Sequence, residues 1–371
     1  MAASGQIPRN AIPREHIRRI LIVKWSALGD VVIASALMED IARAFPDAEI
    51  HLNTQPNCVG LFKADPRFAE VFAIDVRKKG ARWTNTLAWI RKVRSGHYDL
   101  LVDLQRSDHS RFLLTLLWLS GGAPRYRLGN RGGFPYTHQP QNRDPQAHAF
   151  VMMRSVLESV GIPARTPHPV FHPTAKQSQG VQALRAQYGL EDDSYMVLLP
   201  GSHAAGLLKR WGVERFSALA GLLHAQGASK IVLVGGPDEV EDCAQIAAAG
   251  DFIVNLNGKL ELLQIAPLCA GATAIIGNDT GTAHFASAAG RPLLVLCGPT
   301  DPRRVKPTGD STFAVQADLP CINCYAKSCR NPDYHACMKS ITPEWLASMI
   351  PALAAGDFKP GQRFPNGLQS F

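Results

Sequence analysis

The residues of this chain that are best suited to chemistry lie where a short apolar run breaks into a small-residue helix. The apolar run is 273–276, and the chain continues as Gly-Asn-Asp-Thr-Gly-Thr-Ala-His up to His284. The run predicts a buried strand, and the small residues after it predict a helix that ends at Gly290. The start of a helix leaves N–H groups unpaired at the positive end of the helix dipole. This corner is therefore suited to binding a phosphate.

The individual residues of this corner also have ordinary interpretations. Asp279 or Thr280 suits the N-cap position, and Gly281 lets another group approach the backbone. A phosphate would be bound by backbone N–H groups, because the Asp279 carboxylate repels it unless that side chain caps the helix or binds sugar hydroxyls. His284 fits a polar helix face about as well as it fits a ligand contact. Alone, the corner is most simply an ordinary strand-to-helix turn.

A second corner of this kind lies near the N-terminus. The apolar run 20–23 is typical of a buried parallel strand, and Lys24-Trp-Ser-Ala-Leu-Gly-Asp30 separates it from a helical pattern over 31–45. Asp30 lies where the loop meets the helix, so its carboxylate can cap the helix. It can also act as a base at the carboxyl end of a strand, where ligands bind in open α/β sheets. The two roles are compatible.

Two more loops follow predicted strands in the second half of the chain. One begins Pro200-Gly-Ser and ends at Lys209 and Arg210, just before a helical pattern from Val213, and the other is Gly235-Gly-Pro-Asp-Glu239. Lys209 and Arg210 could simply be solvated charges at the start of a helix. Neither Gly-x-Gly-x-x-Gly nor the P-loop motif occurs, which disfavours a nicotinamide dehydrogenase or a nucleoside triphosphatase.

Short apolar runs alternate with helical patterns along the chain, which predicts parallel sheets covered by helices. At 371 residues the chain exceeds one core, so we expect two domains of roughly 150 to 190 residues. The predicted fold class is α/β, with two Rossmann-like, doubly wound domains facing each other across a cleft. The predicted strands of the first domain are 20–23, 49–53, 71–75, 98–104 and 124–128, and those of the second are 196–199, 231–234, 252–255, 273–276 and 293–296.

The predicted domain boundaries follow from this alternation and from a proline-rich stretch at 166–173, which suits a semi-rigid extended link. They are an N-terminal extension 1–17, a first domain 18–172, a linker 173–190, a second domain 191–341 that includes a cysteine-rich loop 318–338, and a C-terminal helix and tail 342–371.

Composition restricts the class of protein. Apolar residues make up 46% and charged residues 19%, a soluble globular balance. The longest apolar run, 112–119, is far shorter than the roughly 20 residues that span a bilayer, and the N-terminus does not read as a secretory signal, so we expect a cytoplasmic protein. The net charge of +8 favours acidic partners. No nucleic-acid-binding motif occurs, which leaves an anionic lipid headgroup or a phosphorylated sugar open.

Taken in order, the motifs resemble glycosyltransferase family 9, the bacterial lipopolysaccharide heptosyltransferases. The set is specific although each motif is weak, and the resemblance covers residues 18–345. The motifs are Lys24-x-Ser-x-x-Gly-Asp30, Pro200-Gly with Lys209-x-Trp211, Gly235-Gly-Pro, Asn278-Asp-Thr-Gly-x-x-His284 and Gly298-Pro-Thr-Asp301.

The resemblance implies a GT-B fold, an ADP-heptose donor held mainly by the second domain, and an anionic lipopolysaccharide inner-core acceptor held mainly by the first. It implies transfer without a metal or other cofactor, and transient work at the inner face of the cytoplasmic membrane. It also implies that the last helix, for which 342–353 is the candidate, crosses back to the first domain.

The resemblance further assigns roles to single residues. Asp30 would take the proton from the acceptor hydroxyl in a single inverting displacement. Lys209 and the backbone at 280–282 would neutralise the departing diphosphate. The residues implied on the acceptor side are Lys24, Ser26 and Gly29. Those implied in donor binding are Ser202, Lys209, Asp238, Glu239, Leu260, Asp279, Thr280, Gly281, Thr282 and His284, where either Asp238 or Glu239 would meet the nucleoside and Leu260 the adenine.

One stretch departs from the family pattern and motivates an alternative. Apolar residues at 204–207 stand where related sequences carry hydroxyls, so Ser202 alone can supply one nearby. The alternative is a non-catalytic protein that binds a nucleotide sugar or an anionic glycan on the same scaffold. A transferase that uses another nucleotide sugar is a third possibility.

The eight cysteines fall into two groups. Four are scattered in apolar or helical contexts and are expected to be small buried side chains: Cys58, Cys243, Cys269 and Cys297. The other four are spaced closely enough to hold a structural zinc or iron ion: Cys321, Cys324, Cys329 and Cys337. For this cluster free thiols are the first interpretation, a metal site is the second, and disulfides are the third.

Overall fold

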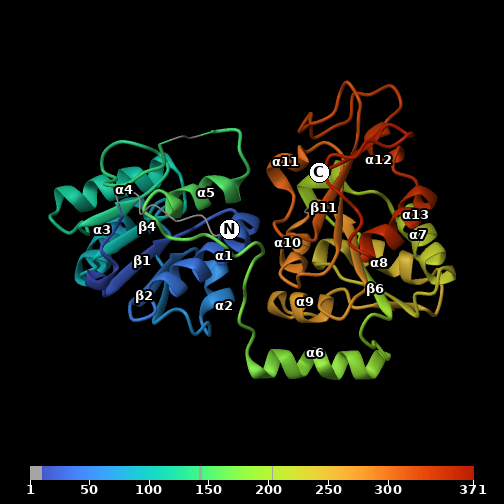
Figure 1. The fold of residues 1–371 in the computed structure, drawn as a ribbon, viewed down its shortest axis with the longest axis horizontal. Coiled ribbons are helices and arrows are strands. Elements are labelled where there is room, and N and C mark those ends of the chain that lie inside the picture. The colour runs from blue at the N-terminus through green and yellow to red at the C-terminus, as the bar shows by residue number, and fades with distance from the viewer. Residues whose placement is uncertain (1–10, 142–143, 203) are drawn as a thin grey trace, which may run out of the picture. The chain divides into compact units, whose positions relative to one another are not determined.

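The structure is a computed structural model that describes residues 11–141, 144–202 and 204–371. It consists of two compact units, residues 1–172 and 173–371, each of which has its own sheet and core (Figure 1). Most of the expected N-terminal extension, residues 1–10, lies outside the described residues. Among the described residues, no helix has the length and apolar character needed to cross a bilayer.

A five-stranded parallel sheet forms the centre of the first unit, in the order β3-β2-β1-β4-β5. The middle strand, β1, has the sequence Arg-Ile-Leu-Ile-Val and is buried on both faces, as a parallel strand flanked by helices must be. The carboxyl ends of β1 and β4 therefore lie side by side at one edge of the sheet. The strands are β1 (Arg19–Val23), β2 (Glu49–Thr54), β3 (Glu70–Ala73), β4 (Leu100–Asp103) and β5 (Tyr126–Leu128).

Helices cover both faces of this sheet. On one face α3 and α4 pack on β1 and β4 through Trp89, Val93 and Leu113, and on the other face α1 packs against α5 (Figure 1). The helices are α1 (Leu28–Ala44), α2 (Val59–Phe62), α3 (Arg82–Ser95), α4 (Asp108–Leu119) and α5 (Ala149–Glu158), with 3-10 turns η1 (Arg14–His16) and η2 (Pro56–Cys58).

The second unit contains a seven-stranded sheet in the order β12-β11-β10-β9-β6-β7-β8, parallel except for the edge strand β12. The strands are β6 (Tyr195–Leu199), β7 (Lys230–Leu233), β8 (Ile253–Asn255), β9 (Ala274–Asn278), β10 (Leu293–Cys297), β11 (Thr312–Ala317) and β12 (Leu368–Ser370). The helices are α6 (Ala175–Tyr188), α7 (Val213–Ala225), α8 (Val240–Ala247), α9 (Leu262–Cys269), α10 (Gly281–Ser287), α11 (Pro302–Val305), α12 (Ala336–Lys339) and α13 (Pro343–Ala354), with 3-10 turns η3 (Ala204–Lys209) and η4 (Pro237–Glu239). All ten predicted strands are present, and the two Rossmann-like parallel sheets are confirmed.

Two predicted segments differ from the structure. The linker 173–190 contains the helix α6, which is capped at Thr174 by a reciprocal bond with Gln177 and ends at Gly189 in a left-handed conformation. The prediction that helix 342–353 crosses back to the first domain is wrong. This helix, α13, packs on α7, and Leu346 and Ile350 are buried in the core of the second unit.

Candidate active site

The loop that follows β1 holds a lysine inside the first unit. Lys24 is 1% exposed, and its Nζ donates a hydrogen bond to the Ser26 carbonyl oxygen at 3.0 Å and lies 3.6 Å from Asp30 Oδ2. Burial lowers the pKa of Lys24 to about 8, against the opposing effect of the Asp30 carboxylate. The loop thus places directly beside Asp30 an amino group whose pKa lies closer to neutral pH than that of an ordinary lysine.

Asp30 does not cap the helix in which it lies. The helix α1 begins at Leu28 after the N-cap residue Ala27, and no side chain makes a capping bond there. The Asp30 side chain is 36% exposed, so solvent or a ligand can reach its carboxylate. The capping interpretation of Asp30 is therefore wrong, although its charge still lies in the first turn, where the helix dipole stabilises it.

The loop after the neighbouring strand β4 completes this site with residues that the motifs did not indicate. Gln105 Oε1 accepts hydrogen bonds from the backbone N–H groups of Trp25 and Ser26, and the Gln105 N–H donates to the buried Asp103 carboxylate. Burial raises the pKa of Asp103, against the hydrogen bond that Tyr136 donates to it. These contacts fix the loop that contains Lys24 and leads into the first turn of α1, where Asp30 lies. The adjacency of β1 and β4 is the signal that could have revealed them.

Arg106 adds a second cation to this site. Its Nε and Nη1 atoms are buried and make no hydrogen bond within the described residues. Burial lowers the pKa of Arg106, and the nearby Asp30 carboxylate opposes that effect. Because a guanidinium group favours carboxylate and phosphate oxygens, this part of the first unit is suited to an anionic ligand.

In the second unit, two predicted donor-binding residues form an ion pair. Lys209 Nζ lies 2.7 Å from Asp279 Oδ2, and the Thr300 hydroxyl donates to the same oxygen at 2.9 Å. The Asp279 side chain is 6% exposed whereas that of Lys209 is 32% exposed. Sequence reasoning gave these two side chains separate ligands, but here they neutralise each other, with Lys209 on the exposed side where an anion can reach it.

Asn278 joins this ion pair to the loop after β6. Its Nδ2 donates to the carbonyl oxygens of Pro200 and Gly201, and its Oδ1 accepts from the Trp211 N–H at 3.1 Å. The Ser202 hydroxyl donates to the Gly206 carbonyl oxygen, which uses its hydrogen within the loop. Asn278 therefore acts as a buried frame that holds the loop containing Lys209.

Arg210 is a structural residue of the same loop. Its guanidinium pairs with Asp242 at 2.7 Å and donates to the carbonyl oxygens of Ser202 and Asp238. It is therefore neither a solvated charge nor exposed for ligand binding, and it ties the Ser202 turn to the Gly-Gly turn.

The corner at the start of α10 has the expected shape. Thr280, not Asp279, occupies the N-cap position, and its side chain makes no capping bond. A Cβ placed on Gly281 would meet nothing within 4 Å, so space remains beside the backbone there. Thr282 lies in the first turn of α10, and His284 is buried on the same helix.

The Gly-Gly turn distinguishes the two acidic candidates. Glu239 is buried, accepts a hydrogen bond from the Gly236 N–H, and lies against Gly201, whereas Asp238 is exposed. Burial raises the pKa of Glu239, against the Gly236 N–H. Leu260 is half-buried just before α9.

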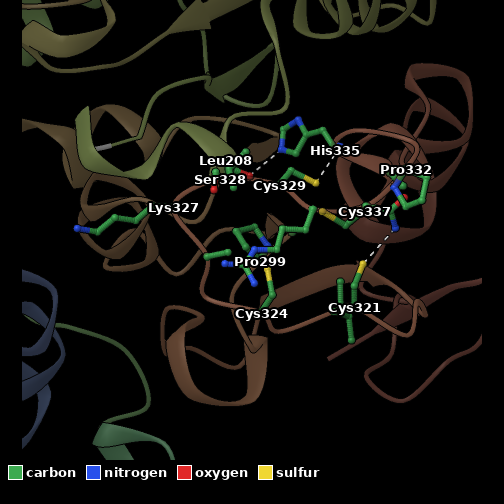
Figure 2. A pocket seen from close by; sticks show the side chains of 16 residues that line it. Leu208, Pro299, Cys321, Cys324, Lys327, Ser328, Cys329, Pro332, His335 and Cys337 are labelled. Carbon is green, nitrogen blue, oxygen red and sulfur yellow. Dashed lines mark hydrogen bonds between the residues drawn. The ribbon is translucent and has the colours of Figure 1, made fainter.

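The four clustered cysteines surround one cavity of about 700 Å³ in the second unit. Figure 2 shows them with His335, and with Leu208 and Pro299 on the wall of the cavity. His335 Nε2 bonds the Leu208 carbonyl oxygen at 2.7 Å, so this loop supports the residue directly before Lys209.

No metal site is formed at this cavity as the side chains lie here. Among the described residues, no three His, Cys, Asp or Glu side chains come together as ligands of one ion, and the cysteines are free. Burial raises the pKa of Cys337 to about 11. The scattered cysteines are all buried, as expected: Cys58, Cys243, Cys269 and Cys297.

Comparison with known proteins agrees with these features. The family model described as glycosyltransferase family 9 (heptosyltransferase) matches residues 86–335. Lipooligosaccharide heptosyltransferase 2 of Haemophilus influenzae is 26% identical over 352 residues, which cover 91% of this chain and 99% of that protein. Lipopolysaccharide heptosyltransferase 1 of Pseudomonas aeruginosa is 27% identical over 337 residues, which cover 84% of this chain and 87% of that protein.

A solved structure shows the same fold. The ADP-heptose lipopolysaccharide heptosyltransferase II of Escherichia coli superposes with a TM-score of 0.68 at 23% identity, and the superposition covers 91% of this chain and 99% of that one. The architecture is therefore the expected GT-B fold of two Rossmann-like units.

Proposed function

This chain belongs to glycosyltransferase family 9, and from that premise we propose that it transfers heptose from ADP-heptose to the inner core of lipopolysaccharide. The observation that carries the proposal is the alignment with heptosyltransferases over nine-tenths of the chain. These relatives are heptosyltransferases that act on lipopolysaccharide or lipooligosaccharide, and the solved relative uses ADP-heptose.

We assign the proton transfer to Asp30. Its carboxylate makes no capping bond and is accessible, and it lies near the carboxyl end of the central strand. Asp30 would accept the proton of the acceptor hydroxyl as that oxygen attacks the anomeric carbon, and ADP would leave in the same inverting step. Lys24 and Arg106 place positive charge beside Asp30, which favours an acidic acceptor.

The donor is assigned to the loops of the second unit. A diphosphate that approaches Lys209 can replace part of the ion pair with Asp279, whose carboxylate then becomes available to sugar hydroxyls. The free N–H groups at Gly281 and Thr282 and the Lys209 ammonium would share the charge of the departing ADP. Glu239 or Asp238 would meet the nucleoside, Leu260 the adenine, and His284 a phosphate or the heptose. Ser202 would support this site through its loop, because its hydroxyl is buried and bonded to the Gly206 carbonyl oxygen.

The transfer reaction tests the assignment of Asp30. We expect the unmodified chain to move label from radiolabelled ADP-heptose to a defined inner-core acceptor, and to do so in the presence of EDTA. Asp30→Asn should lower kcat at least about 100-fold while the Kd for ADP is unchanged, because only the proton acceptor is lost. Transfer at the normal rate by Asp30→Asn would refute the base.

The same assay separates the alternatives. A non-catalytic binding protein, suggested by the apolar stretch 204–207, would bind ADP-heptose by calorimetry but transfer nothing. If the chain prefers another nucleotide sugar in a donor panel, the donor in our proposal would change, but the reaction would still be glycosyl transfer. Work at the inner face of the cytoplasmic membrane is part of the proposal, because an inner-core acceptor is attached to lipid.

A further inference from the structure

Two neighbouring helices of the first unit expose large apolar side chains on their outer sides. Trp83 is 65% exposed and Leu87 is 51% exposed on α3, and Phe112 and Leu119 are 43% and 67% exposed on α4. Residues four or seven positions apart lie on one face of a helix, so each pair forms an outer apolar stripe. The opposite faces of the same helices are buried in the core, and the outer stripes therefore contribute nothing to the core.

The two stripes belong to one surface. At the start of the helices, the charge of Arg82 on α3 acts on His109 of α4. At their ends, the side chains of Arg94 and Leu117 both border Gly122. Because α3 and α4 run side by side on the same face of the sheet (Figure 1), their outer sides point in the same direction. We call the residues Trp83, Leu87, Phe112, Trp118 and Leu119, with the cations beside them, the α3–α4 surface.

The segment that contains α3 is strongly basic. Residues 76–95 contain no Asp or Glu and seven basic residues, which are Arg77, Lys78, Lys79, Arg82, Arg91, Lys92 and Arg94. Among the described residues, Lys92 is the one member of this set that makes an ion pair, with Glu70. Unpaired cations therefore border exposed tryptophan and leucine side chains. Tryptophan favours the membrane–water interface, and juxtamembrane Lys and Arg residues are attracted to anionic lipids.

We propose that the α3–α4 surface docks this protein on a membrane of anionic phospholipid, with Trp83, Leu87 and Leu119 entering the interface and the arginines meeting lipid phosphates. This inference deepens the proposed function, because it gives the lipid-attached acceptor a surface on which the enzyme approaches it. Arg77 connects the surface to the site, since its Nη1 donates to the Ser26 hydroxyl at 3.0 Å, in the loop that contains Lys24 and precedes α1.

The charge decides between a membrane and a second copy of the chain. Two copies that docked through this surface would bring two unpaired basic segments together, and the chain as a whole carries +8. Like charges at an apolar contact cost free energy, whereas an anionic bilayer supplies both the apolar interior and the opposite charge. A membrane therefore satisfies both features of this surface at once.

Vesicle binding tests the proposal without donor or acceptor, so its failure would leave the transfer reaction untouched. The full chain is sedimented with phosphatidylcholine vesicles that either contain or lack phosphatidylglycerol. The test variant is Leu87→Ser/Arg91→Gln on α3, and Leu119→Ser on α4 is a second variant. The matched control is Val151→Ser/Arg154→Gln on α5, which packs with α1 on the other face of the sheet; Val151 is 53% exposed, close to Leu87.

We expect the unmodified chain to bind the anionic vesicles more tightly than the neutral ones, and added salt to weaken this binding. The test variant should bind at least about tenfold more weakly, because it loses one cation and one apolar anchor. Leu119→Ser should also weaken binding. The control should bind as the unmodified chain does. The proposal is overturned if the unmodified chain does not bind anionic vesicles, or if the control loses as much binding as the test variant. It is also overturned if the unmodified chain is a dimer through this surface and the test variant is a monomer.

Discussion

At the scale of single residues, Lys24 makes the clearest prediction about pH. Burial lowers its pKa from 10.5 to about 8 in the folded chain. Between about pH 8 and 10.5 the unfolded chain therefore binds more protons than the folded chain, so the lysine's contribution to stability rises with pH across this window and is lost as pH falls toward 8. The full change corresponds to about 3 kcal/mol.

The measurement compares the unmodified chain with Lys24→Met in urea unfolding at a series of pH values. The free energy of unfolding of the unmodified chain should rise relative to that of the variant from about pH 8 upward. Lys63→Met, which replaces an exposed lysine, is the control and should give a difference without this slope. A flat difference for Lys24→Met would mean that the amino group is not desolvated as the structure has it.

The sequence alone could predict several residues of the site but not the tertiary contacts between them. Asp30, Lys209 and Asp279 were singled out because each follows a predicted strand. The pairing of Lys209 with Asp279 was not predictable, since these residues are 70 positions apart and follow two different strands, β6 and β9. Gln105 and Arg106 were missed because no motif includes them, and they lie beside the loop that precedes α1 only because β4 pairs with β1.

At the scale of elements, Gly201 is required by the close approach of two loops. A Cβ at this position would lie 2.1 Å from Glu239 Cγ, and Glu239 is itself buried and bonded to the Gly236 N–H. Gly201→Ala should therefore destabilise the second unit by about 1 to 3 kcal/mol, since the buried carboxylate must move. Thermal unfolding measures the effect.

The control for this prediction is a glycine with free space around it. A Cβ on Gly221, inside α7, would meet nothing within 4 Å. Gly221→Ala should stabilise the chain by about 0.5 to 1 kcal/mol, because alanine is a better helix former than glycine. Equal melting temperatures for the two variants would contradict the contact between Gly201 and Glu239.

Elements with continuous apolar sequences could be predicted from the chain, and those stabilised by other means could not. The runs that became β1, β6 and β10 are buried on both faces, which is why they read as parallel strands. The helix α6 buries only Val181 and depends on its caps, so its apolar pattern is weak. The short strand β12 forms by pairing with β11, a contact that a three-residue segment cannot signal.

At the scale of the whole molecule, the chain divides into two units whose sheets and helices are each complete. Every residue assigned to the donor, from Ser202 to His284, lies in the second unit, and α13 completes the core of that unit. Units of this size with their own core generally fold alone. We therefore expect fragment 173–371 to unfold cooperatively and to bind ADP with a Kd within a few-fold of the full chain, while fragment 1–172 folds without binding ADP.

Calorimetry with ADP checks this division, and Lys209→Ala within fragment 173–371 is the control for specificity. Removing one charge-assisted bond to a phosphate should weaken ADP binding about 10-fold to 100-fold. Lys230→Ala, at the opposite end of a strand in the same sheet, should leave the Kd unchanged. Neither fragment alone, nor both mixed, should transfer heptose at the rate of the intact chain, because the base lies in the first unit and the linking segment that holds the two together is cut. A folded second fragment that fails to bind ADP would show that the donor needs residues of both units.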